Sequence, residues 1–83
     1  MDDTFTLEIK TPEKSVFFDR ALQLTAQAAD GEIGILPGHA PLATRLKAGS
    51  LAIVLETGET KKIGGSEGFL IVSKNNVSVL MKK

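Results

Sequence analysis

His39 is the only histidine of the 83-residue sequence, and histidine is the side chain best suited to act as a general base near neutral pH. Nucleophilic catalysis needs such a base beside an activated hydroxyl or thiol, and His39 is the sole conventional candidate for that role. A metal site needs several converging ligands, whereas the sequence has one histidine and no cysteine. We therefore predict no catalytic residue, no metal site and no cofactor. Two interpretations of His39 remain: a turn residue bonded to the backbone, or part of a loop tip presented to another protein.

Two other motifs resemble cofactor or nucleotide sites. Residues 64–68, Gly-Gly-Ser-Glu-Gly, are as rich in glycine as a phosphate-binding loop, but the closing Lys-Ser/Thr pair and a following helix are missing. We interpret this run as a bend between strands. Met81-Lys82 is weakly similar to the attachment site of biotinyl or lipoyl domains. In those domains the lysine lies at the tip of a mid-chain hairpin, whereas Lys82 is the second-last residue, so we expect no attached cofactor.

The composition excludes several classes of partner. Ten basic residues balance ten acidic ones, so the surplus of positive charge that a nucleic-acid binder needs is absent. The longest apolar run, residues 51–55, is far shorter than the roughly 20 residues of a membrane-spanning helix, so we expect no direct membrane insertion. The acidic start of the sequence has no basic leader or apolar block, which predicts that there is no secretory signal.

The elements that would position a site are short strands. In residues 4–10 polar and apolar side chains alternate, which predicts a half-buried strand, and Pro12 predicts a turn after it. A short return at residues 16–18 and a second alternating run at 20–29 follow. Residues 32–42 indicate two short strands around a loop, with Pro37-Gly38 at the centre of a type II turn.

The second half of the sequence predicts a meander. Apolar runs alternate with turn signals at Thr57-Gly58, at Gly64-Gly65 and at Asn75-Asn76, which we expect to form a two-residue hairpin loop. Some runs are apolar on both faces and others are half polar, which favours two sheets packed face to face. We predict one all-β domain over residues 1–83, a two-sheet sandwich or flattened barrel.

Residues 31–42, Gly-Glu-Ile-Gly-Ile-Leu-Pro-Gly-His-Ala-Pro-Leu, closely resemble the loop signature of the F-type ATP synthase epsilon chain. Residues 5–14 are similar to the opening strand and turn of that family, and residues 46–51 to its "LKPG" corner. Residues 65–72 and 75–80 are similar to its closing hairpin. The resemblance covers essentially the whole sequence.

The resemblance implies a two-sheet sandwich of about ten short strands. It also implies a non-catalytic rotor subunit of a proton-translocating ATP synthase. Such a sandwich would bind the gamma subunit and contact the c-ring at the cytoplasmic face of the bacterial inner membrane, as a peripheral protein. It would rotate with gamma and couple proton flow to ATP synthesis. The residues expected at the gamma and c-ring contact are Glu32, Pro37, Gly38, His39, Ala40 and Pro41. A free-standing β-sandwich that binds a protein or another ligand is the alternative function.

The sequence departs from the family pattern in two places. The segment 25–30 lacks the proline and extra glycine that many members carry before Gly31. The C-terminal helical hairpin of the family has no counterpart in the 83 residues, so its ATP binding and its inhibition of ATP hydrolysis are not expected here. A naturally short protein and a part of a longer chain are both compatible with this pattern.

Overall fold

The computed structural model describes residues 3–82, and every regular element among them is a β-strand. The predicted all-β class is confirmed, but these residues form eight strands rather than the predicted ten or so. In chain order they are β1 (Phe5–Lys10), β2 (Ser15–Ala28), β3 (Gly31–Ile35), β4 (Leu42–Leu46), β5 (Gly49–Leu55), β6 (Thr60–Gly65), β7 (Gly68–Ser73) and β8 (Asn76–Met81).

The lower strand number follows mainly from β2, which has 14 residues. The two runs predicted at 16–18 and 20–29 belong to this one strand. Its first half pairs with β1, and its second half pairs with β3 and β5. The register with β5 shifts between Ala21 and Gln23, and an extra residue of this kind bends a strand and increases its twist. One continuous strand can therefore serve both layers of the fold.

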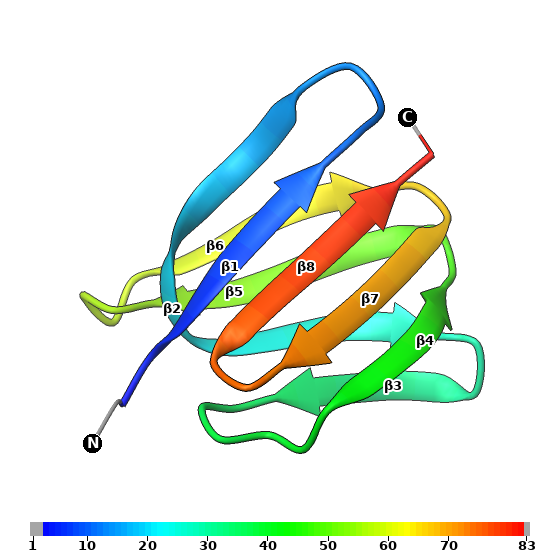
Figure 1. The fold of residues 1–83 in the computed structure, drawn as a ribbon. Coiled ribbons are helices and arrows are strands. Elements are labelled where there is room, and N and C mark those ends of the chain that lie inside the picture. The colour runs from blue at the N-terminus through cyan, green and yellow to red at the C-terminus, as the bar shows by residue number, and fades with distance from the viewer. Residues whose placement is uncertain (1–2, 83) are drawn as a thin grey trace.

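The strands form two layers, as Figure 1 shows. One layer contains β4, β7, β8 and β1, in which β1 and β8 run parallel, and the other contains β3, the second half of β2, β5 and β6. Antiparallel pairing of β1 with β2, and a single pair of β2 with β4, join the layers at both sides. The predicted sandwich or flattened barrel is confirmed.

The core lies between the layers and is almost entirely aliphatic. Period-two alternation sends every second side chain of a strand inwards. The largest fully buried side chains are Phe5, Leu7, Ile9, Leu24, Ile35, Ile53, Leu70 and Val79. Thr4 is the buried polar residue of the described part of the chain, and its hydroxyl accepts a hydrogen bond from Arg20 Nε at 3.1 Å. Among the residues that the structure describes, no buried side-chain nitrogen or oxygen lacks a hydrogen-bond partner, as expected of a well-packed core.

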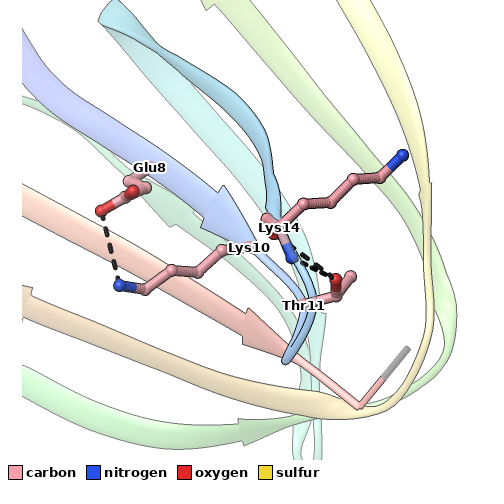
Figure 2. Close-up of polar contacts among 4 residues, drawn as sticks. All are labelled: Glu8, Lys10, Thr11 and Lys14. Atoms are coloured by element: carbon pink, nitrogen blue, oxygen red, sulfur yellow. Dashed lines mark hydrogen bonds and ion pairs between the residues drawn. The ribbon is translucent and has the colours of Figure 1, made fainter.

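The turn between β1 and β2 is held by its own polar groups (Figure 2). Thr11 N–H donates to the Lys14 carbonyl at 2.9 Å, and Lys14 N–H donates to the Thr11 hydroxyl at 3.3 Å. Glu8 and Lys10 form a partly exposed ion pair at 3.9 Å on β1. Pairs of this kind contribute only about 0–1 kcal/mol, so the turn rather than the ion pair defines this corner.

The β7–β8 hairpin differs from the prediction by one residue. Ser73 pairs with Asn76, so the two-residue loop consists of Lys74 and Asn75, and not of Asn75 and Asn76. Lys74 adopts the positive φ of 56° that the turn needs, a conformation expected of an asparagine. The strand pairing has therefore overridden the residue preference.

Candidate protein interface

The loop between β3 and β4, residues 36–41, contains a tight turn. His39 N–H donates to the carbonyl of Leu36 at 3.1 Å, which closes a four-residue β-turn with Pro37 and Gly38 at its centre. Gly38 has a φ of 81°. Proline at the second position and a positive φ at the third define a type II turn, so the predicted turn is confirmed. Pro41 lies directly before β4, outside the strand ladder, as its missing N–H requires.

The His39 side chain bonds to the backbone of its own loop. Its Nδ1 lies 2.7 Å from the carbonyl oxygen of Ala40. A carbonyl only accepts, so Nδ1 carries the hydrogen and donates it. Among residues 3–82 no group of three or more histidine, cysteine, aspartate or glutamate side chains is placed to hold a metal ion. The imidazole therefore helps to shape the loop, which agrees with the first of the two interpretations of His39.

Ser66, in the glycine-rich run 64–68, is flanked by glycines at a spacing that the sequence interpretation did not consider. Gly64, Ser66 and Gly68 match the Gly-x-Ser-x-Gly pattern of a nucleophile elbow, which needs a strand before it and a helix after it. Here a strand, β7, follows instead. Ser66 precedes β7 and the His39 loop contacts the turn beyond its far end, so about 20 Å of strand separates the two residues. Ser66 and His39 therefore do not form a catalytic pair.

The other sequence candidates lie at the Ser66 end of the molecule. Gly64 and Gly65 belong to β6, opposite Ser50 and Gly49. Lys82 follows β8; its N–H donates to the Glu67 carbonyl at 2.9 Å and its Nζ lies 3.5 Å from the Glu67 carboxylate. An open groove of about 400 Å³ lies beside them, lined in part by Arg45 and Lys47. The lysine is therefore at a strand end and not at a hairpin tip, unlike the attachment lysine of a biotinyl domain.

The loop is connected to a distant part of the chain through Asn75. Gly38 N–H donates to Asn75 Oδ1 at 3.4 Å, and Thr6 N–H donates to the Asn75 carbonyl at 2.8 Å. Asn75 thus bridges the loop to the start of β1. Sequence reasoning missed this residue because 37 positions separate it from Gly38 and no local pattern relates them.

The predicted interface residues do not all lie together. Residues 37–41 share the loop, but Glu32 lies in β3, where it pairs with Gln27. Three residues of extended strand, about 10 Å, separate Glu32 from the end of β3. Gly38, Ala40 and Pro41 are exposed, and so is Glu32. The structure therefore offers two neighbouring surfaces where the sequence suggested one loop.

Exposed apolar side chains form a part of the surface that the prediction left out. Leu36, in the same loop, is 56% exposed, and Phe69 and Ile71 on β7 are 51% and 40% exposed. Phe69 and Ile71 pair with Arg45 and Ala43 of β4. The continuous apolar run at 69–72 was the available signal for these side chains, and of this run only Leu70 and Val72 are buried. Exposed apolar groups that cluster are typical of protein interfaces.

Comparisons with known proteins agree with these features. The family model "ATP synthase, Delta/Epsilon chain, beta-sandwich domain" matches residues 4–83. The ATP synthase epsilon chain of Carboxydothermus hydrogenoformans is 48% identical over 80 residues, which cover 96% of this chain and 59% of the relative. That of Koribacter versatilis is 45% identical over 80 residues, 96% of this chain and 56% of the relative. The chain thus spans about three fifths of the length of these relatives.

Solved structures show the same fold. A chain in the cryo-EM structure of the Euglena gracilis mitochondrial ATP synthase, OSCP/F1/c-ring, superposes with a TM-score of 0.93 at 21% identity and covers 100% of this chain and 53% of its own length. A chain in the Tetrahymena thermophila mitochondrial ATP synthase central stalk/c-ring structure gives a TM-score of 0.77 at 20% identity, over 94% of this chain and 63% of its own. Within residues 3–82 no helix is long and apolar enough to cross a membrane. On the family match and the identity to epsilon chains, this chain belongs to the ATP synthase delta/epsilon family, a family of non-catalytic subunits, through its β-sandwich domain.

Proposed function

We propose that this chain is a rotor subunit of a proton-translocating ATP synthase that binds the gamma subunit and contacts the c-ring. It turns with gamma and couples proton flow to ATP synthesis, and residues 1–83 act as one domain. Its place is peripheral, at the cytoplasmic face of the bacterial inner membrane. The identity of 45–48% to bacterial ATP synthase epsilon chains is the observation that carries this proposal.

The β3–β4 loop is the proposed contact with the c-ring and gamma. Its backbone is fixed by the Leu36–His39 turn bond and by the His39–Ala40 bond, while Ala40 and Pro41 remain exposed. A loop that is ordered before it binds loses less conformational entropy in the complex. Glu32 contributes a second, separate contact on β3, and a single exposed ion pair there adds only about 0–1 kcal/mol.

The outer face of β7 is the proposed apolar part of the gamma contact. Phe69 and Ile71 expose about half of their surface in the isolated chain. A non-catalytic subunit that must turn with its partner needs an interface that excludes water, and aromatic anchors supply most of the energy of such interfaces. The neighbouring Arg45 adds a side chain that is enriched in protein interfaces.

Co-purification with gamma tests the proposal. The chain should form a stable complex with gamma, and the complex should join a c-ring. The double variant His39→Ala with Glu32→Lys should weaken assembly without unfolding the domain, because both residues lie outside the buried core. Failure of the unaltered chain to bind gamma would contradict the function and favour a free-standing binding module. Unchanged assembly of the folded double variant would contradict only the assignment of these residues.

A further inference from the structure

The turn at Pro37-Gly38 leaves one backbone donor without a partner inside the turn. Pro37 has no N–H, and the N–H of His39 bonds to Leu36. The remaining donor, Gly38 N–H, is directed at the side chain of Asn75, whose Oδ1 lies 3.4 Å away. This bond joins the tip of the loop to the β7–β8 hairpin.

We propose that Asn75 is a positioning residue that holds the Pro37-Gly38 turn in its partner-binding orientation. The inference rests on the proposed function, since the partner is gamma together with the c-ring. Asn75 would touch neither partner itself. It acts through the turn, and its contribution to binding is pre-organisation, because a loop held in place loses less freedom when it docks.

The backbone of Asn75 is well placed for this role. Its carbonyl accepts the N–H of Thr6 at 2.8 Å, at the point where β1 begins its parallel pairing with β8. The pair between Ser73 and Asn76 closes the turn around it. Asn75 is thus held by three strands, β1, β7 and β8, whereas the loop it contacts is an irregular connection. The side chain of Asn75 therefore links residue 38 to these three strands.

A residue at position 75 can bond to Gly38 only if its side chain is short and carries a hydrogen-bond acceptor. The amide oxygen of asparagine accepts the Gly38 N–H, and a carboxylate oxygen at the same position also accepts. An alanine offers no acceptor, yet it leaves the bond between Thr6 N–H and the carbonyl of residue 75 in place, because that bond is made by the backbone. Asn75→Ala should therefore fold and lose the contact with Gly38, and Asn75→Asp should keep that contact.

The test compares Asn75→Ala, Asn75→Asp and the control Asn76→Ala, an exposed neighbour in β8. Amide hydrogen exchange measured by NMR on the 83-residue chain should be roughly two- to tenfold faster at Gly38 in Asn75→Ala, as expected for one lost hydrogen bond. Gly58, in the distant β5–β6 turn, is the internal reference. The dissociation constant for gamma with the c-ring should rise by a similar factor. Asn75→Asp and Asn76→Ala should match the unaltered chain in both measurements.

Each result has one meaning. Equal exchange at Gly38 in Asn75→Ala and the unaltered chain overturns the proposal, and so does faster exchange with unchanged binding. Weaker binding in Asn75→Ala that Asn75→Asp does not restore, despite restored exchange, also overturns it. If the unaltered chain itself does not bind gamma, the proposed function fails instead, and the exchange data still show whether Asn75 orders the loop.

Discussion

Gly68 lies so close to the carbonyl oxygen of Leu80 that a Cβ atom at position 68 would overlap that oxygen. Gly68 begins β7 and pairs with Met81, and the next residue along, Lys82, donates its N–H to the carbonyl of Glu67. The backbones of the two strands therefore meet without room for a side chain. This close approach is the structural reason for the glycine that ends the run 64–68.

Gly68→Ala should destabilise the domain by about 1–3 kcal/mol, since the backbone must shift to admit the methyl group. Gly34→Ala is the matched control, because a Cβ atom there meets nothing within 4 Å and its φ is not in the left-handed region. That change should leave the free energy of unfolding within about 0.5 kcal/mol or raise it slightly. Urea denaturation of both variants measures the difference. Equal stability of the two variants would contradict the close approach.

Gly38→Ala should separate the shape of the loop from the stability of the fold. Gly38 and Gly58 both have positive φ, 81° and 93°, and both have open space at the Cβ position. Each alanine should therefore cost about 1–2 kcal/mol of unfolding free energy. Only Gly38→Ala should weaken assembly with gamma and the c-ring, because only residue 38 lies in the proposed interface. Thermal denaturation and co-purification measure the two effects, and weaker assembly in Gly58→Ala would show a general loss of stability instead.

The local features of the fold could be predicted from residue types alone. Alternation in residues 4–10 predicted β1 and its buried face, and Pro37-Gly38 predicted the type II turn. The continuity of β2 could not be predicted, because a bulge that carries one strand from layer to layer has no turn residue to mark it. The parallel pairing of β1 with β8 joins the two ends of the chain and is equally invisible to short-range patterns.

The interface was only partly predictable for a related reason. The loop signature drew attention to residues 37–41, but Glu32 was grouped with them by sequence proximity, although the strand carries it away from the loop. Asn75 was assigned to a turn with no further role, because its contact with Gly38 depends on the tertiary fold. The exposure of Phe69 could not be predicted, since hydrophobicity alone does not say which face of a strand is covered.

Phe69→Ser should weaken gamma binding by about 1–2 kcal/mol, because an aromatic side chain that is half exposed in the free chain would lose its buried place in the complex. Its effect on the stability of the free chain should be smaller than that of Leu70→Ala. Leu70 is fully buried next to it, and its truncation should lower the free energy of unfolding by about 2–5 kcal/mol. Calorimetry of binding and chemical denaturation measure the two quantities. Unchanged gamma affinity in Phe69→Ser would remove β7 from the interface.

Glu32 and His39 should contribute independently to assembly. Glu32 is held in β3 by its pairing with Gln27, and about 10 Å of strand separates it from the loop that holds the imidazole, which bonds to Ala40. Substitutions this far apart with no shared partner usually add to within about 0.5 kcal/mol. A double-mutant cycle with Glu32→Lys and His39→Ala, read as the free energy of binding to gamma and the c-ring, should therefore show a coupling energy below that value. A coupling above about 1 kcal/mol would mean that one partner group contacts both residues at once. The two surfaces would then act as one site in the complex.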